Sequence, residues 1–576
     1  MCGCPAGSLA RRFWVISLLV SLFLLQAFSG LSMDNPLRTF TNLAGDSPHQ
    51  DLSSSEVRFP YQTLSCHAGY RPHQDVTSSA GSSPHQTFHS FYADVEVDSG
   101  ELLDGMLSGL VELILPLAEQ TALQTIQELD NRPGNSTWRH PSHTDPATGR
   151  WVLGPQYTSR RWWTSGYFAG KLWLLYELTG DHFWREHARL YTDDLKPEMT
   201  YSGDHDTGLK IFTSFGNAFR LLQSQPDSRV VITGAQTLST RFDSRIGAIK
   251  SWEPWEPWDW NYPVIIDNLM NLEILFWVSE FTGNERLGEI AEQHALTTLK
   301  HHIRDDGSHY HIVDFDAAGE PRWKGTVQGY GPESTWARGQ AWGIYGFAMA
   351  YRFTGREEFA DASRKMAGYF LEHLPNDGVP FYDFLDPAIP NTTKDASASA
   401  VAASGLIELY ELTGEERWME AAGMLLLALS EPEYLDDSGQ MSSLLMRGTI
   451  HRGDAERGLI YADYYFLEAL SRYSRLTGRP TPAITPQYQN YLGQNYPNPF
   501  RGTTQIPYAV EEPGNVRLSV YTVTGRKVYR VVDRQMAPGN YLATFEASSL
   551  DLAAGVYLYR LETQEEVLSQ KMLLIR

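Results

Sequence analysis

Two helical patterns meet in the ten residues LYELTGDHFW, numbers 175–184. The first apolar pattern of helical spacing ends at Thr179-Gly180, and the second begins directly after it. Gly180 suits the left-handed backbone conformation that closes many helices. The same phrase returns four times, with its glycine at Gly283, Gly355, Gly414 and Gly478. The sequence therefore predicts repeated helix–turn–helix hairpins.

The number of these turns indicates how the helices are arranged. Five turns and an opening helical pattern near residues 101–128 predict about six hairpins. Six hairpins can close into a ring, an (α/α)6 barrel, whereas an open solenoid is the alternative. We favour the barrel because the conspicuous aromatic and acidic segments fall in the connections, where a barrel mouth would gather them. The predicted fold class is mainly α, with the barrel over residues 96–479.

After residue 479 the chain changes from helical to strand periodicity. Repeated prolines mark a linker, which we place at residues 480–493. Apolar and polar residues then alternate in short runs, such as Val516, Leu518 and Val520, with glycines between the runs. Residues 494–576 are therefore predicted to form a small immunoglobulin-like β-sandwich, in which no residue pattern indicates catalysis.

The N-terminus has the order of a secretory signal peptide, which we place at residues 1–30. Arg11 and Arg12 precede an apolar run at 13–28, and small residues follow. The alternative is a membrane anchor, but the run of about 16 residues is shorter than the ~20 that a spanning helix needs. Residues 31–95 are rich in Ser, His, Gln and Pro, which predicts a disordered leader.

Composition and charge limit the possible function classes. The chain has 576 residues, of which 42% are hydrophobic, and a formal net charge of −22. A general nucleic-acid binder would carry a basic face, so this class is excluded, whereas an anionic sugar needs only a few local cations. Cys2 and Cys4 leave with the signal peptide, so Cys66 remains alone. The mature protein is predicted to contain no internal disulfide, no cysteine metal cluster and no stable membrane span.

Two acidic segments lie in connections of the predicted barrel. The first is GDHDTG at residues 203–208, and the second is PVIIDNLMNL at 263–272. Asp267 follows an apolar run and opens a helical pattern, where a lone aspartate is usually a helix cap. A second conspicuous aspartate, Asp206, lies in an equivalent loop, and tryptophans lie near Asp267. The pattern therefore favours a pair of catalytic carboxylates.

Tryptophans gather in the same connections. Aromatic faces suit the apolar faces of sugar rings, and binding residues are concentrated in loops. The alternative is that these side chains seal the ends of the hairpins. Their repetition between glutamates and prolines favours a binding groove lined by Trp162, Trp163, Trp252, Trp255, Trp258, Trp260, Trp336 and Trp342.

Taken together, these segments resemble glycoside hydrolase family 88, the unsaturated glucuronyl hydrolases. The resemblance extends from Trp162 to Leu470 and implies an (α/α)6 barrel, in agreement with the count of hairpins. Thr207 stands where the family usually has leucine, and Ala462 where it usually has glycine. We therefore expect loop shape and substrate fit to differ from those of the family. The matching segments are WTSGYFAG (163–170), HDTG (205–208), PVIIDNLMNL (263–272), QGY (328–330), STWARGQAW (334–342), YDF (382–384), KDASA (394–398) and residues 461–470.

The resemblance implies roles for individual residues. Asp267 matches the general acid and base, and Asp206 matches its carboxylate partner. Arg338 is a candidate for a charge-assisted contact with the uronate. No metal or organic cofactor is implied. The positions that match substrate-binding residues are Trp163, His205, Trp252, His311, Gln328, Trp336, Arg338, Trp342 and Tyr382.

The implied reaction is hydration of the C4=C5 double bond that polysaccharide lyases leave in a terminal uronic acid. Asp267 would protonate C4 and help water to add at C5, after which the hemiketal opens and the sugar leaves. The helix N-terminus would lower the pKa of Asp267, whereas burial and an ionised Asp206 would raise it. We therefore predict that the two carboxyls titrate as a coupled pair.

The last eighty or so residues resemble the C-terminal sorting domain of type IX secretion cargo. This implies export to the cell surface or the medium through a dedicated export machinery. The alternative is a generic immunoglobulin-like module that binds carbohydrate. The matching residues are NYPNPF (495–500), Val520-Tyr521 with Thr524-Gly525, GVYLYRL (555–561) and KMLLIR (571–576).

Three other functions stay open at this point. One is an unsaturated rhamnogalacturonyl hydrolase, and another is an inverting glycosidase with carboxylates roughly 6.5–9.5 Å apart. The third is a non-catalytic glycan-binding protein, which would not need two convergent carboxylates. Near the predicted rim, Arg447, His451 and Arg452 either contact an anionic group of the oligosaccharide or form solvated surface.

Overall fold

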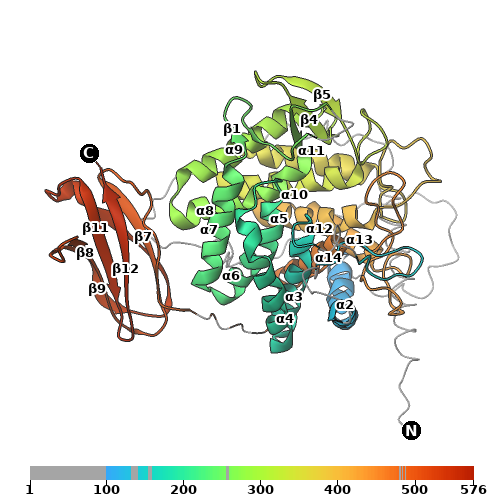
Figure 1. Cartoon of the computed structure of the whole chain (residues 1–576). Helices are drawn as coiled ribbons and strands as arrows, with labels where there is room; N and C mark the ends of the chain where they lie inside the picture. Colours follow the sequence, from blue (N-terminus) through green and yellow to red (C-terminus); the bar gives the residue numbers. More distant parts are fainter. Residues whose placement is uncertain are drawn as a thin grey trace, which may run out of the picture.

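The computed structural model describes residues 99–130, 140–153, 159–254, 259–478, 482, 484, 486 and 488–575. The predicted signal peptide and the predicted leader lie outside these residues, as do Trp255 and Trp258. Within the described part, a large helical body lies beside a smaller all-β tail (Figure 1). No helix among the described residues is long and apolar enough to cross a membrane.

Two rings of helices make up the helical body. The inner ring consists of α3 (Ser165–Thr179), α5 (Thr207–Ile211) with α6 (Asn217–Leu222), α8 (Glu273–Thr282), α10 (Ala337–Thr354), α12 (Ala396–Thr413) and α14 (Ile460–Leu476). The outer ring consists of α2 (Ser99–Asp130), α4 (His182–Asp194), α7 (Gln225–Ser239), α9 (Glu285–His302), α11 (Glu357–Glu372) and α13 (Glu416–Leu429). Helix α14 packs on α3, and α13 packs on α2, so both rings close. The helices therefore form a barrel and not an open solenoid.

The sequence explains which helices lie inside. Helix α12 is buried along most of its length, and its many Ala and Ser residues allow neighbouring helices to approach closely. At Gly405 an added Cβ would lie 2.9 Å from the backbone of Tyr345 on α10, so glycine is required for this contact. The outer helix α11 instead buries one face, with Phe359, Met366 and Phe370 at helical spacing.

Glycines close most hairpins as the sequence predicts. Helices α3, α8, α10 and α12 each end at a glycine in the left-handed conformation, with φ between 65° and 71°. The hairpin between α6 and α7 has no such signal, because Gln223 takes the left-handed conformation there, with φ 57°. Helix α14 ends before Gly478 and pairs with α2, which completes the sixth pair of helices among the described residues.

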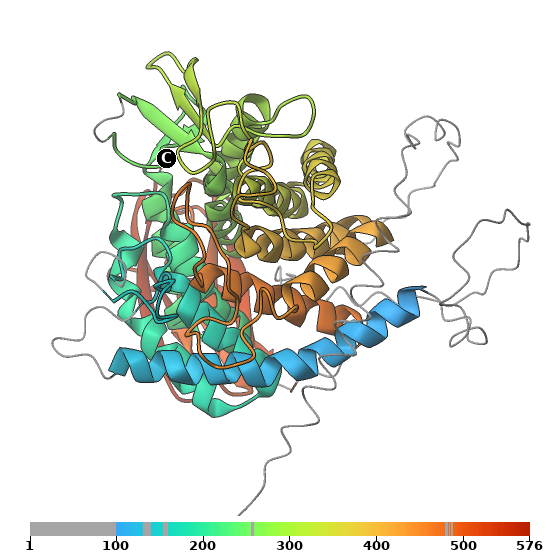
Figure 2. The same ribbon diagram turned by 90° about the vertical axis from the view of Figure 1, so that its right-hand side faces the viewer.

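The inner helices all begin at one end of the barrel, which we call the mouth. Two small antiparallel sheets, which the sequence analysis did not predict, lie among its connections. One pairs β1 (Phe242–Asp243) with β2 (Ala248–Ile249). The other contains β3 (Tyr262–Ile265), β4 (Ile312–Phe315) and β5 (Pro321–Gly325), with Ile265 opposite Ile312. Figure 2 looks at the barrel from the side of the long connections.

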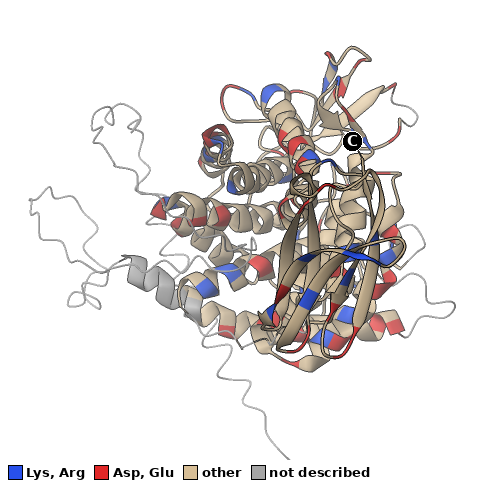
Figure 3. Ribbon diagram, turned by 90° about the vertical axis from the view of Figure 1, so that its left-hand side faces the viewer, with Lys and Arg blue, Asp and Glu red and all other residues tan. Residues whose placement is uncertain are grey.

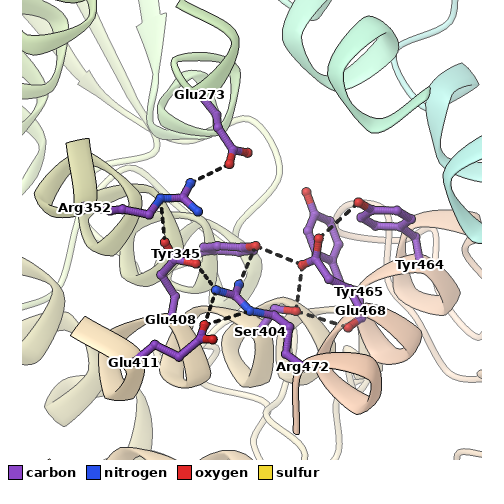
Figure 4. A network of polar contacts seen from close by, with 10 residues as sticks. All are labelled: Glu273, Tyr345, Arg352, Ser404, Glu408, Glu411, Tyr464, Tyr465, Glu468 and Arg472. Carbon is purple, nitrogen blue, oxygen red and sulfur yellow. Dashed lines mark hydrogen bonds and ion pairs between the residues drawn. The ribbon is translucent and has the colours of Figure 1, made fainter. Parts of the chain in front are cut away.

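Farther along the inner helices a charged network fills the axis of the barrel (Figure 4). Glu468 accepts hydrogen bonds from Tyr345 (3.0 Å), Ser404 (2.8 Å) and Tyr464 (3.1 Å). Arg472 pairs with Glu408, whose side chain is 1% exposed. Other members are Arg352, which pairs with both Glu408 and Glu273, and Glu411, which pairs with Arg472. We call these residues the axial charge network.

The tail consists of two antiparallel sheets. One has the strand order β10 (Gly539–Glu546), β7 (Thr503–Val510), β6 (Tyr491–Leu492). The other has the order β12 (Val567–Leu574), β11 (Gly555–Glu562), β8 (Gly514–Thr522), β9 (Lys527–Met536). The alternating residues Val516, Leu518 and Val520 are buried in their common core, as period 2 predicts.

The tail contacts the end of the barrel opposite the mouth, which we call the closed end. Asn540 bonds to Gln223 and Gln225, at the turn between α6 and α7. Tyr496 bonds to Asn284, at the turn between α8 and α9. In Figure 2 the strands of the tail accordingly lie behind the helices. Seen from the tail side, basic and acidic residues are interspersed and form no uniformly basic face (Figure 3).

Candidate active site

Asp267 lies where strand β3 leads into the inner ring. It belongs to the first turn of a 3₁₀ helix, Ile266–Asn271, which continues into α8. The backbone N–H of Ile266 donates to the carbonyl of His311 at 3.0 Å, so the small sheet fixes the start of this turn. The prediction that Asp267 opens a helix is correct, although its first turn is 3₁₀ and not α.

Asp206 lies at the start of the neighbouring inner helix, α5. An added Cβ on Gly208 would lie 2.6 Å from the Cα of Asn271, so α5 and the turn that carries Asp267 touch. The side chain of Asn271 accepts a hydrogen bond from the backbone of Leu209 at 2.8 Å and strengthens this contact. The two aspartates are therefore held at the mouth by adjacent, interlocked helix starts.

Each aspartate has a buried histidine beside it. His205 Nε2 lies 3.4 Å from Asp206 Oδ1, and His311 Nε2 lies 3.5 Å from Asp267 Oδ2. Burial lowers the pKa of His205 to about 4 and the pKa of His311 well below its usual value. Both imidazoles are therefore neutral near pH 7, and act as hydrogen-bonding groups, not as cations.

Burial raises the pKa values of both carboxyls to about 7. For Asp267, the Arg338 charge opposes this rise and the Asp206 charge adds to it. For Asp206, the largest charge effect is the upward one of Asp204, which Lys210 opposes. The pKa of Asp267 is raised, as predicted, whereas the effect of Asp204 on the pKa of Asp206 was not predicted.

Arg338 packs against the ring of Trp336 and is fully buried. Its Nη1 donates to Asp395 at 2.6 Å and to the carbonyl of Thr449, and its Nη2 donates to the carbonyl of Ile450 at 2.8 Å. Nε has no hydrogen-bond partner in the described part of the chain. The guanidinium is therefore held in a fixed position, from which its charge acts on Asp267.

The tryptophans predicted to bind sugar fall into two groups. Trp163 and Trp252 are partly exposed, with Trp163 packed against Tyr461 and Trp252 lying 6.1 Å from the His205 ring. Trp336 and Trp342 are each 1% exposed and form the wall of the site. Of these four, only Trp163 and Trp252 therefore have side-chain surface that a ligand can reach in this conformation. Of the other described tryptophans of the predicted groove, Trp162 is partly exposed and Trp260 is buried.

Buried polar atoms around Asp267 lack hydrogen-bond partners among the described residues. These atoms are Asp267 Oδ2, His311 Nε2, Trp336 Nε1 and Arg338 Nε. The His311 ring lies 4.6 Å from the Trp336 ring, over which the Arg338 guanidinium lies at 4.5 Å, so the group is continuous. Buried polar groups in folded proteins are nearly always satisfied, so this group is suited to a ligand rich in hydroxyls and carboxylates.

Comparison with known proteins identifies the chain. Residues 142–408 match Glycosyl Hydrolase Family 88. An unsaturated glucuronyl hydrolase of Formosa agariphila is 40% identical over 325 residues, which cover 54% of this chain and 80% of that protein. The chain belongs to glycoside hydrolase family 88. A solved unsaturated glucuronyl hydrolase specific for heparin matches this family 88 enzyme with TM-score 0.58 and 32% identity, over 64% of this chain and 98% of that one.

Two further similarities were found, one to another hydrolase and one in the tail of the family 88 enzyme. An unsaturated chondroitin disaccharide hydrolase of Streptococcus pyogenes is 33% identical over 54% of this chain and 81% of that protein. Residues 494–575 match the secretion system C-terminal sorting domain. The solved relatives support the barrel, and the tail is a β-sheet region with the sequence of a sorting domain.

The remaining predicted residues of the family 88 enzyme lie at the rim. Gln328 Nε2 donates to the carbonyl of Ile450 at 2.9 Å, and Tyr382 is buried in the connection before α12. Arg452 is exposed and lies over Tyr330, whereas Arg447 pairs with Glu433 and Glu456. Of the three residues considered for anion binding, Arg452 is exposed, His451 is exposed but lies 3.9 Å from Asp454, and Arg447 is paired with two glutamates.

Some residues of the site had no role in the sequence analysis. Asp204 accepts from Lys210 at 3.0 Å and from the backbone of Asp206 at 2.9 Å. Asp395 holds Arg338 and caps α12 through the backbone of Ser397. Asp395 stands in a segment that resembles the family and Asp204 directly before one, but only the folded chain shows which partner each residue takes.

Proposed function

We propose that Asp267 is the general acid and base of this glycoside hydrolase and that Asp206 is its carboxylate partner. The enzyme releases 4,5-unsaturated uronic acid from the non-reducing end of oligosaccharides that lyases produce. The observation that carries the proposal is the pair of buried carboxyls, each with a pKa raised to about 7, at adjacent helix starts in the mouth. A carboxyl that both gives and takes a proton works best with a pKa near the working pH.

The proposed reaction begins with protonation of C4 by Asp267. Water then adds at C5 and gives its proton to the Asp267 carboxylate, which restores the acid. The product is a hemiketal, and its ring opens with departure of the remaining sugar. His311 and Arg338 Nε are the proposed hydrogen-bonding groups for the uronate, and Trp163 and Trp252 provide faces for the rings.

The function is tested by the ultraviolet absorbance of the C4=C5 double bond. The purified full chain is mixed with unsaturated disaccharides from chondroitin and heparin, the substrates that the names of relatives give. Loss of absorbance with release of the second sugar is expected, and saturated disaccharides should stay intact. Cleavage of the saturated compounds alone would support an inverting glycosidase, and turnover only of rhamnogalacturonan fragments would support the rhamnogalacturonyl alternative.

The pH dependence of kcat/KM follows from the two carboxyls. The active form needs Asp267 protonated and Asp206 ionised, so activity should fall as pH rises through the upper pKa of the pair and as pH falls through the lower one. Removing the Asp204 charge lowers the pKa of Asp206, and the released Lys210 lowers it further. The Asp204→Asn variant should therefore keep activity to lower pH than wild type, and an acidic limb that stays in place would contradict this assignment.

We also propose a function for each segment of the chain. Residues 1–30 act as a signal peptide, 31–95 as a leader, 96–479 as the catalytic barrel and 480–493 as a linker. Residues 494–576 form an immunoglobulin-like sorting domain that addresses the enzyme to the secretion machinery, so the mature protein is placed at the cell surface or in the medium. The match to sorting domains and the two-sheet tail support this division.

A chain that ends at Gly478 tests the independence of the tail. Because the tail contacts turns at the closed end and the first turns of α7, away from the mouth, kcat and KM of the shortened enzyme should equal those of the full chain. Secretion by the native host should be lost. The absorbance assay on purified protein checks the first point, and immunodetection in medium and cell fractions checks the second. A large rise in KM would show that the tail shapes the mouth.

A further inference from the structure

A cavity lies among the connections that lead to Asp204 and Trp252. It has a volume of about 350 Å³, and its lining includes Ser202, Arg241 and Lys250. The cavity shares two chain segments with the active site, because Ser202 is close to Asp204 in sequence and Lys250 is close to Trp252. Asp204 and Trp252 themselves pair as an antiparallel bridge. Two segments of the cavity lining therefore lead directly into residues of the candidate active site.

Arg241 is the fixed cation of this cavity. Its side chain is 6% exposed, its Nε donates to the carbonyl of Lys250 at 2.8 Å, and its Nη1 donates to the carbonyl of Ser202 at 2.5 Å. Nη2 is buried and has no hydrogen-bond partner among the described residues. It forms an ion pair with Glu253 Oε1 at 3.5 Å. A rigid guanidinium thus has one nitrogen beside the cavity that is paired with an exposed carboxylate and makes no hydrogen bond within the described residues.

Lys250 and Glu253 complete the arrangement. Lys250 Nζ donates to Glu253 Oε2 at 2.6 Å, so the two cations share a single carboxylate. The Glu253 side chain is 64% exposed, and exposed ion pairs contribute little stability, so a ligand can displace it at small cost. The other acidic residue of the lining, Asp243, is held by both Nε and Nη2 of Arg245.

We propose that this cavity is an accessory subsite for an oxyanion, a sulfate ester or a carboxylate, on the sugars that follow the cleaved bond. The inference rests on the proposed function and adds to it the position at which longer acidic fragments are recognised. A buried guanidinium beside an ammonium group is suited to oxyanions, and Glu253 occupies their place in the free enzyme. Because the whole chain has a net charge of −22, a local pair of cations favours binding of an anionic group at this position.

Two variants of the full chain test the subsite with opposite expected signs. The substrates are unsaturated tetrasaccharides of equal length, one sulfated beyond the cleaved bond and one neutral there. Lys250→Met should raise KM for the sulfated fragment about tenfold more than for the neutral one, since a charge-assisted hydrogen bond is lost. Glu253→Gln should lower KM for the sulfated fragment, because the competing carboxylate is gone. A merely structural role would move both variants in the same direction, and that result overturns the proposal.

Binding of inorganic sulfate, measured by calorimetry, gives a readout that needs no turnover. Sulfate should bind the wild-type chain, bind more weakly to Lys250→Met and bind more tightly to Glu253→Gln. If the enzyme acts on no unsaturated fragment but sulfate behaves in this way, the proposed function fails and the oxyanion site stands. If sulfate binds as expected but the variants change KM equally for both tetrasaccharides, the cavity binds free anions only. The proposal that it recognises an oxyanion on the fragment is then overturned.

Discussion

The Asp267→Asn variant is expected to lose about 10²–10⁴-fold in kcat, the usual contribution of a general acid–base group. An amide of the same shape cannot deliver a proton to C4 or take one from water. KM should change little, because the carboxamide keeps the size of the side chain and the aromatic wall stays in place. The measurement is the decrease in ultraviolet absorbance of an unsaturated disaccharide.

Asp259→Asn is the matched control for this variant. Asp259 lies eight positions earlier, and its side chain is 98% exposed, so the same change of charge there should leave kcat unaltered. An Asp267→Asn enzyme that keeps most of its activity would remove Asp267 from the mechanism.

Stability measurements distinguish a loss of catalysis in this variant from a loss of the folded structure. A carboxyl whose pKa is raised from 3.8 to about 7 binds its proton more tightly in the folded state. Its contribution to stability is therefore present at low pH and is lost as pH rises through about 7. The Asp267→Asn variant has no such loss, so it should unfold at a higher temperature than wild type at pH 8. An inactive variant that is also less stable at that pH would leave misfolding as the cause.

The largest expected effect on stability belongs to Lys171→Met. Lys171 on α3 and Asp463 on α14 are fully buried, and their Nζ and Oδ2 atoms lie 2.8 Å apart. Asp463 also accepts from the backbone N–H groups of Leu444 and Leu445, so the pair ties a long connection to the place where the inner ring closes. Removing one partner of a buried ion pair costs about 3–5 kcal/mol, because the other charge stays buried alone.

Unfolding of the barrel in urea measures this cost. Arg286→Met is the control, since Arg286 and Glu289 form an exposed pair on α9 with side chains 57% and 62% exposed. That change should cost under about 1 kcal/mol. If the two variants lose the same free energy of unfolding, the buried pair does not hold the ring closed.

The barrel could be predicted from the sequence because its turns carry glycine. Gly180 and its counterparts need the left-handed conformation, and this requirement is visible in the sequence. Gln223 adopts the same conformation without glycine, so its hairpin left no signal. The small sheet with β3 was also missed, because its strands are short and their apolar residues match a helix start equally well.

The site could be predicted only as a set of residue types. Asp206 and Asp267 stand in recognisable segments, and the structure places them at adjacent helix starts. The partners of Arg338 could not be predicted, because two of them are backbone carbonyls of Thr449 and Ile450, which carry no side-chain signature. Asp204 was missed for a related reason, since its effect on Asp206 depends on how a tight loop folds back.

The axial charge network lies between the inner helices, on the far side of the site from the mouth. Glu408, Glu468 and Arg472 occupy the axis toward the closed end, where a chain would otherwise have to pass through. We therefore expect a fragment to reach the site through the mouth with its terminal residue first. An enzyme built in this way should be distributive and not processive: it should trim one terminal residue per encounter, so its throughput should depend on the number of chain ends that the upstream lyase creates.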